Sequence, residues 1–281
     1  MEESEYIEDL KSLLEKSVEK VIKGKKSEDI AVAFSGGVDS ALIAKLLVNF
    51  GLKPTAYVIG IKDCRDFSEA ENAANELGLK LKKILLSEDE IKKELPVQSK
   101  ILKKLYESNK EKIKPENPET KLNPVSVSSN FPLFFVEKYA KEKYVFSGLG
   151  ADTILGGFAK YLILEKKQAE EELEKDTTAL FRFDYLEDVE TAKIFNKEIL
   201  MPFLDKDLVE FCIKIPYELK INGKIRKYIL RKTAEKIGLS KELAFKEKKS
   251  AQYGSGLMKM MKRVAKKEGM KISDYIRFVS K

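Results

Sequence analysis

The stretch IAVAFSGGVDS, residues 30–40, decides the fold class of this chain. Its first five residues are apolar, which is the length and composition of a buried strand. A Ser-Gly-Gly turn follows, and the apolar segment from Val38 to Phe50 is expected to form a helix that Gly51 ends. A buried strand that turns through glycines into a helix is the repeating unit of an α/β sheet.

The same alternation continues on both sides of this unit. Further strands are predicted at 55–60, 81–86 and 144–147, and helices at 3–23, 67–77, 88–109 and 132–141, with a proline-rich loop at 113–124. Strands that alternate with helices form a parallel sheet covered on both faces. No strand pattern is evident after Ala151, so the C-terminal region is expected to be mostly helical. We therefore expect an N-terminal helix at 1–27, an α/β domain at 28–158 and a helical region at 159–281.

Composition excludes several classes of protein. With 43% hydrophobic and 35% charged residues among 281, the chain is typical of globular proteins rather than disordered ones. No apolar run is long enough to span a membrane, and the acidic N-terminus is unlike a signal peptide, so a cytoplasmic location without a membrane partner is expected. Cys64 and Cys212 lie too far apart in the sequence for a zinc site or a disulfide framework.

The net charge of +7 has two interpretations. Lysines alternate with glutamates along most of the chain, which favours a solvated, ion-paired surface of the kind enriched in thermophiles. The alternative is a nucleic-acid partner. The basic stretch KEKKSAQYGSGLMKMMKRVAKK, residues 246–267, is the strongest candidate to meet phosphate, either of a nucleotide or of RNA.

The sequence contains no histidine. This excludes Ser-His-Asp and Cys-His catalysis and His-ligated metal sites, because histidine is the commonest general base and metal ligand. The remaining chemistry depends on carboxylates, lysines, arginines, tyrosines, backbone amides and a hard cation.

The glycine turn at 35–40 is a candidate phosphate site. Gly36 and Gly37 allow backbone amides to approach an anion, and the following helix start adds its positive dipole. Ser35 and Ser40 can donate hydroxyl hydrogen bonds. The carboxylate of Asp39 fits beside phosphate only if a cation lies between them, and magnesium is the usual one. The plain alternative is a tight turn in which Asp39 caps the helix.

The motif SGGVDS resembles the SGGxDS loop of the N-type PP-loop ATP pyrophosphatases, which have a HUP-like α/β fold. Three further segments resemble the synthetase domain of glutamine-hydrolysing asparagine synthetases: FSGLGADTILGGF at 146–158, MPFLD at 201–205 and NGKIRKYILR at 222–231. They follow the family's order, so the resemblance covers about residues 28–256. It implies an AMP-forming ligase that cleaves ATP between the α- and β-phosphates, adenylates a carboxylate or amide, and passes it to ammonia or an amine.

The resemblance also implies roles for individual residues. Asp39 and Asp152 would hold magnesium, and Lys227 would stabilise the transition state as a fixed cation. The C-terminal region would complete the active site. The implied ATP-binding residues are Phe34, Ser35, Gly36, Gly37, Val38, Asp39, Ser40, Ile59, Gly60, Ser147, Gly148, Lys224 and Lys227.

Each of these roles has a plainer alternative. Asp152 also suits a helix N-cap, as does Asp66, which matches the family by its spacing from Ile59. Lys224 and Lys227 would share a helix face if the helix begins at Asn222-Gly223, and could simply be exposed.

Three positions depart from the family. The glutamate of its SGEG segment is Leu149 here, and two of its arginines align with Ser128 and Leu200. Losing these charges suggests an acceptor other than aspartate, and a less charged one. Glutamine-dependent members begin with a glutaminase whose cysteine follows the initiator methionine, whereas position 2 here is Glu2. Nitrogen is therefore expected from free ammonia, an amine substrate, or a separate ammonia- or sulfur-supplying protein.

Two other functions remain as alternatives. A tRNA-modifying enzyme would adenylate a nucleobase before sulfur or an amine enters; the basic stretch and Cys64, whose pKa Lys62 and Arg65 could lower, favour it. Cys212 instead resembles a core residue. A non-catalytic nucleotide-binding protein is the second alternative, although a dead site has no need to keep both aspartates and Lys227. The oligomeric state is open, and a homo-oligomer is one option.

Overall fold

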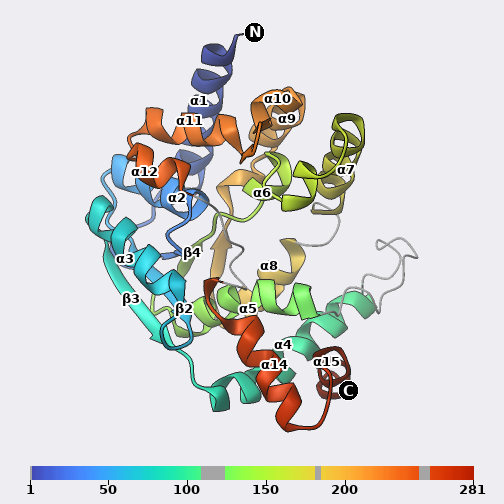
Figure 1. The fold of residues 1–281 in the computed structure, drawn as a ribbon. Helices are drawn as coiled ribbons and strands as arrows, with labels where there is room; N and C mark the ends of the chain where they lie inside the picture. Colours follow the sequence, from blue (N-terminus) through green and yellow to red (C-terminus); the bar gives the residue numbers. More distant parts are fainter. Residues whose placement is uncertain (1, 109–123, 181–184, 247–253) are drawn as a thin grey trace.

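The computed structural model describes residues 2–108, 124–180, 185–246 and 254–281. Five parallel strands form the central sheet in the order β3-β2-β1-β4-β5 (Figure 1). This order reverses direction between β1 and β4, and ligands of open α/β sheets bind at such a switch point, beyond the carboxyl ends of the strands. The strands are β1 (Ile30–Ala33), β2 (Thr55–Gly60), β3 (Lys80–Leu85), β4 (Tyr144–Phe146) and β5 (Glu198–Leu200).

Alternate residues of the central strands enter two different cores. Ile30 and Val32 of β1 belong to the core on one face of the sheet, and Ala31 to the core on the other. β2 divides in the same way, with Val58 on the first face and Tyr57 on the second. Side chains that alternate across a strand need apolar cover on both faces, as the continuous apolar run of β1 predicts.

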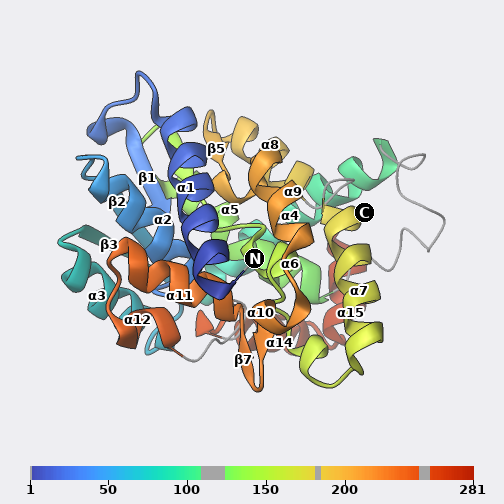
Figure 2. The ribbon, with the colours of Figure 1, turned by 90° about the horizontal axis from the view of Figure 1, so that it is seen from above.

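Helices from both ends of the chain cover the first face. α1 packs on α9, α2 and α11, so the N-terminal helix is part of the core rather than an appendage (Figures 1 and 2). The helices of this face are α1 (Glu3–Ile22), α2 (Val38–Asn49), α3 (Arg65–Leu77), α9 (Lys206–Lys214), α11 (Tyr228–Ile237) and α12 (Lys241–Phe245).

The second face is covered by helices that surround a cluster of phenylalanines. α5 packs on β2, α4, α8 and α14, and α15 packs on α4. These helices are α4 (Glu88–Ser108), α5 (Pro124–Tyr139), α8 (Tyr185–Ile194), α14 (Leu257–Lys267) and α15 (Ile272–Val279). A smaller cluster joins α7 (Lys166–Ala179), the 3₁₀ helix η3 (Ala159–Leu162) and β6 (Ile221–Asn222).

The predicted α/β fold is confirmed, and the strands and helices predicted up to residue 109 agree with the structure to within two residues. The helix expected near Pro132 begins instead at Pro124. Val127, Phe131 and Phe135 are all buried, so a helical apolar period runs across Pro132 and the proline does not start the helix. Most of the proline-rich segment lies outside the described residues.

The expectation that no strand follows Ala151 was wrong. β5 forms the fifth strand of the sheet, beside β4, and β6 pairs with β7 (Ile225–Arg226) as an antiparallel hairpin. Both elements are too short, at three and two residues, to show a period in the sequence. The boundary at residue 158 stays a prediction, although β5 places part of the C-terminal region within the sheet.

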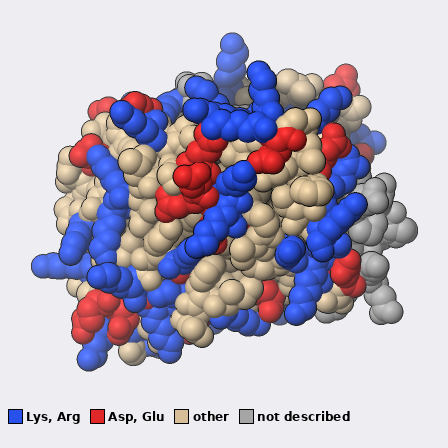
Figure 3. Space-filling model, turned by 90° about the horizontal axis from the view of Figure 1, so that it is seen from below, with Lys and Arg blue, Asp and Glu red and all other residues tan. Residues whose placement is uncertain are grey.

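The surface mixes charges of both signs. Figure 3 shows lysine and arginine side chains spread over one face, with aspartates and glutamates among them. On α14, Arg263 and Lys267 both pair with Glu88, while Leu257 and Met261 face the core. The basic helix is thus an amphipathic, partly ion-paired surface helix. In the described part of the chain, no helix is both long and apolar enough to cross a membrane.

Candidate active site

The glycine turn at the end of β1 has a conformation that the sequence requires. Gly36 has φ +73°, and a Cβ on it would lie 2.4 Å from the backbone oxygen of Glu69, so only glycine fits. Gly37 is the N-cap of α2, and none of the described side chains caps this helix. The first backbone N–H groups of α2 therefore suit an anion, as at other helix N-termini that follow glycine turns.

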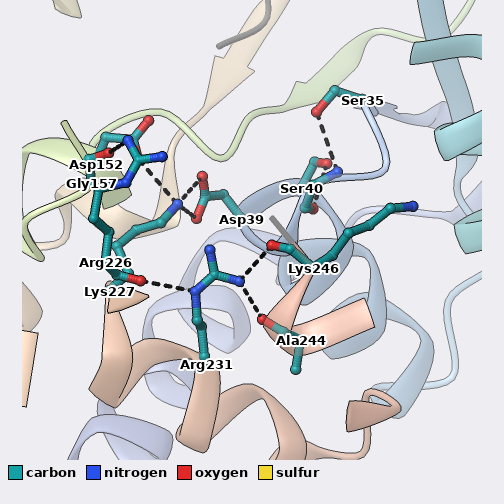
Figure 4. A network of polar contacts seen from close by, with 11 residues as sticks. Ser35, Asp39, Ser40, Asp152, Gly157, Arg226, Lys227, Arg231, Ala244 and Lys246 are labelled. Atoms are coloured by element: carbon teal, nitrogen blue, oxygen red, sulfur yellow. Dashed lines mark hydrogen bonds and ion pairs between the residues drawn. The ribbon is translucent and has the colours of Figure 1, made fainter. Parts of the chain in front are cut away.

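A buried lysine joins this turn to two other parts of the chain. The Lys227 ammonium lies 2.5 and 2.6 Å from the carboxylate oxygens of Asp39 and 3.0 Å from Oδ1 of Asp152 (Figure 4). Asp39 lies in the first turn of α2, and Asp152 in α6 (Ala151–Ile154), directly after the β4 loop. Lys227 is 0% exposed, so the alternative that it is simply an exposed surface lysine is wrong.

Local backbone geometry brings these three groups together. A Cβ on Gly148 would lie 2.9 Å from Cβ of Asp39, so a glycine after β4 lets this loop pack against the start of α2. Lys227 itself has φ 54°, in the left-handed region, between β7 and α11. This conformation costs a non-glycine residue about 1–2 kcal/mol. Such strain is typical of residues whose position serves function.

A large cavity opens beside this triad. Its volume is about 800 Å³, and its wall includes the glycine turn, the β4 loop, α4, α5 and α8. Its described basic side chains are Arg65, Arg226, Lys227, Arg231 and Lys246. All five come from α3, the β6–β7 hairpin, α11 or the segment after α12, which places positive charge at the phosphate-loop end.

Arg231 fixes this basic end through backbone carbonyls. Its guanidinium donates to the carbonyl oxygens of Arg226 at 2.8 Å, Ala244 at 2.7 Å and Lys246 at 2.9 Å (Figure 4). Burial lowers the pKa of Arg231, with Asp39 acting in the opposite direction. Arg231 thus ties the chain before α11 to the end of α12.

We expect Arg231→Met to destabilise the fold by about 4 kcal/mol or more, because three hydrogen bonds from a charged group are lost. Methionine fills a similar volume but leaves three carbonyls without their donor, and hydrogen bonds from charged groups contribute about 1.5–3 kcal/mol each. Urea denaturation measures this difference. A variant as stable as the wild type would show that these carbonyls find other partners.

Most of the predicted site residues line the cavity. They are Phe34, Ser35, Gly36, Gly37, Val38, Asp39, Ser40, Ile59, Ser147, Gly148, Asp152 and Lys227. Gly60 and Lys224 are not among the lining residues. Gly60 packs against Cys64 and Ser255. None of the three aspartates with an N-cap alternative, Asp39, Asp152 and Asp66, is an N-cap. The N-caps are Gly37 for α2, Gly150 for α6 and Cys64 for α3.

Two expectations about the site need correction. Asn222-Gly223 does not begin a helix but turns the β6–β7 hairpin, with Gly223 at φ +57°, so Lys224 lies exposed at the hairpin tip and shares no helix face with Lys227. Asn-Gly is the preferred pair for such a turn.

The pKa of Cys64 is raised by burial rather than lowered by its basic neighbours. Cys212 is a fully buried core residue, as expected, and burial raises its pKa to about 12.

Sequence reasoning missed several cavity residues. Arg226 and Arg231 lie inside the NGKIRKYILR motif and could have been found there, and Lys246 begins the basic stretch. Asp66, which the sequence had already singled out by its spacing from Ile59, also lines the cavity, where burial raises its pKa to about 7. Glu187 and Asp188 of α8 had no motif to mark them.

The residues present fit a divalent cation held between two carboxylates and phosphate. The positively charged Lys227 ammonium lies between the carboxylates of Asp39 and Asp152 and pairs with both of them. The described residues contain no group of three or more acidic or cysteine side chains that could hold a metal by themselves. Two carboxylates suffice for magnesium, which usually completes its shell with phosphate oxygens and waters.

A glycine turn at the switch point of a parallel sheet, with carboxylates after β1 and β4, defines a PP-loop type α/β protein. The asparagine synthase family model matches residues 9–184 and 162–270. A putative glutamine-hydrolysing asparagine synthetase of Methanocaldococcus jannaschii is 32% identical over 95% of this chain and 52% of its own length. The chain belongs to the asparagine synthase family.

A more distant relative by sequence agrees with this assignment. A glutamine-hydrolysing asparagine synthetase of Bos taurus is 27% identical over 88% of this chain and 44% of its own length. The chain thus spans about half the length of the curated relatives it matches. Among solved structures, an NMN synthetase of Francisella tularensis covers 100% of this chain and 93% of its own, with 15% identity and a TM-score of 0.44, which is a distant likeness.

Proposed function

We propose that this chain is an ATP-dependent, AMP-forming synthetase that adenylates a carboxylate or amide and transfers it to ammonia or an amine. The observation that carries the proposal is the Lys227 ammonium between Asp39 and Asp152, beside the glycine turn. A dead nucleotide-binding protein would have no need to bury a lysine in left-handed backbone between two carboxylates.

Each group has a part in this proposal. The amides at the start of α2, with Ser35 and Ser40, would bind the phosphates. Asp39 and Asp152 would hold magnesium, and Mg-ATP supplies the adenylyl group and the pyrophosphate leaving group. Lys227 and Arg226 would keep positive charge beside the leaving phosphates, which is the largest contribution that a fixed site can make. The cavity wall would position the acceptor and exclude water.

The acceptor is proposed to be less charged than aspartate. Leu149, where the family has a glutamate, lines the cavity together with Leu133, Val136 and Leu180. Ser128 and Leu200 are both buried, and neither is among the cavity residues. These apolar walls favour an acceptor with a hydrocarbon portion next to its reacting carbonyl.

The proposal is tested by ATP–pyrophosphate exchange. The protein is incubated with Mg-ATP, labelled pyrophosphate and panels of small carboxylates, amides and tRNA. Exchange that depends on a carboxylate or amide, with AMP release on adding ammonia or an amine, is the expected result. Exchange with tRNA alone would identify the modifying enzyme instead, and ATP binding without exchange under all conditions would leave a nucleotide-binding protein. A cytoplasmic location and a separate nitrogen-supplying subunit remain predictions.

A further inference from the structure

A cluster of three charged side chains borders the glycine turn where α3 packs against it. Nε of Arg65 lies 2.9 Å from Oε1 of Glu69, and the Lys246 ammonium pairs with Oε2 of the same carboxylate. All three side chains line the cavity. They come from two segments of the chain, the first turns of α3 and the residue directly after α12. One carboxylate thus holds two cations in the cavity wall.

Packing fixes this cluster next to the turn. The backbone oxygen of Glu69 is the atom that would lie 2.4 Å from a Cβ on Gly36, so α3 rests directly against the glycine turn. The carbonyl oxygen of Lys246 accepts from Arg231 at 2.9 Å, which ties this part of the backbone to α11. Figure 4 shows the Lys246 side chain pointing away from Arg231 and Lys227. The cluster is therefore a second group of charges at the turn, apart from the ion pairs of Lys227.

The cluster carries more positive than negative charge. In the described part of the chain, Arg65 and Lys246 both pair with the single carboxylate of Glu69. Asp66 on the same helix also lines the cavity, but burial raises its pKa to about 7, so it is only partly charged near neutral pH. The bond from Arg65 uses Nε, and the two Nη groups make no hydrogen bond with the described residues. An anion in the cavity would find both positive charge and N–H donors here.

The other described basic residues of the cavity wall are already engaged. Arg231 donates to three backbone carbonyls, and Arg226 donates to a fourth at 2.8 Å. Lys227 pairs with both aspartates that would hold magnesium. The same aspartates would offset the charge of that magnesium, whereas the phosphates of ATP carry several negative charges. Arg65 and Lys246 are the described cavity cations that remain to offset them.

We propose that Arg65 and Lys246 form a pyrophosphate subsite, in which they bind the β- and γ-phosphates of ATP and then the pyrophosphate that leaves. The planar guanidinium of an arginine can donate to two phosphate oxygens at once, and the ammonium of a lysine adds a compact charge. Glu69 holds both side chains beside the turn. This inference rests on the proposed function and deepens it, because it assigns the leaving group to one part of the same cavity.

Binding of pyrophosphate alone tests the subsite without any turnover. The full chain is titrated calorimetrically, with magnesium present, against sodium pyrophosphate and, separately, against AMP, which has only the α-phosphate. Arg65→Met and Lys246→Met are each expected to weaken pyrophosphate binding by about 10-fold or more, since each removes charge-assisted hydrogen bonds. The affinity for AMP should change by less than about a factor of two, because AMP lacks the phosphates that the subsite would hold.

Lys83→Met is the matched control. Lys83 of β3 pairs with Glu71 of α3 at 2.7 Å but does not line the cavity, so this variant should bind pyrophosphate as the wild type does. Circular dichroism checks the fold, and Lys246→Met decides the matter if Arg65→Met unfolds. Unchanged pyrophosphate affinity in a folded variant, an equal loss of AMP affinity, or no pyrophosphate binding by the wild type would each overturn the subsite. Pyrophosphate binding that both variants weaken, without exchange in the presence of any acceptor, would refute only the proposed function.

Discussion

Asp39→Asn is expected to lower turnover by about 1,000-fold or more while the fold is retained. The substitution keeps the size of the side chain but removes one of two carboxylates that would hold magnesium, and it unbalances the charge around Lys227. Asparagine can still accept a hydrogen bond from the lysine, so the fold should persist. The measurement is acceptor-dependent ATP–pyrophosphate exchange at saturating magnesium, with thermal unfolding as the check of structure.

Asp9→Asn is the matched control for this variant. Asp9 is an exposed aspartate on α1, outside the cavity, and its replacement should leave exchange within a factor of two. Full activity in folded Asp39→Asn would disprove the assignment of Asp39 as a magnesium ligand. The glycine turn would then bind phosphate by its amides and cations alone.

Lys227→Met is expected to abolish exchange and, in the absence of magnesium, to destabilise the protein by about 3 kcal/mol. Removing the buried ammonium takes away the cation that lies between Asp39 and Asp152, and breaking a buried ion pair costs about 3–5 kcal/mol. The lower end applies because the two carboxylates are 19% and 27% exposed. Magnesium should restore stability to the variant, since it can take the place of the lost ammonium.

Thermal unfolding with and without magnesium measures this effect apart from activity. If Asp39 and Asp152 hold magnesium as proposed, the ammonium of Lys227 competes with magnesium for these carboxylates in the wild type, so added magnesium should raise the melting temperature less than it does in Lys227→Met. Lys236→Met is the control, because Lys236 forms a half-exposed surface pair with Glu8, and such pairs contribute about 0–1 kcal/mol. Equal magnesium effects in the wild type and Lys227→Met would show that the lysine does not occupy the cation site.

Much of the fold was predictable because its signals are local. β1 can be recognised from five apolar residues followed by a glycine turn, and β2 from a six-residue segment between two turns. β5 was missed because a three-residue strand has no period of its own and exists only by pairing with β4. The start of α5 was misplaced because Pro132 looked like a beginning, although the apolar helical period ran across it.

The candidate site was only partly predictable. Asp39 and Asp152 each follow a strand in a recognisable motif, so their approach at the sheet edge follows from topology. The Asn222-Gly223 pair, by contrast, was taken for a helix start when it turns a hairpin, and this error misplaced Lys224. The pKa of Cys64 was predicted from its neighbours in the sequence, whereas the pKa of a thiol depends on its surroundings in space.

The sequence by itself determined the parallel α/β sheet, the glycine turn after its first strand and the motifs that mark the asparagine synthase family. These are properties of short segments, in which period, turn chemistry and residue type act over a few positions. Only the tertiary structure decided that Lys227 enters between two aspartates, one of them 188 residues away. The reason is that the effect of burying a charge depends on its partners, and only the packing of helices on the sheet brings those partners together.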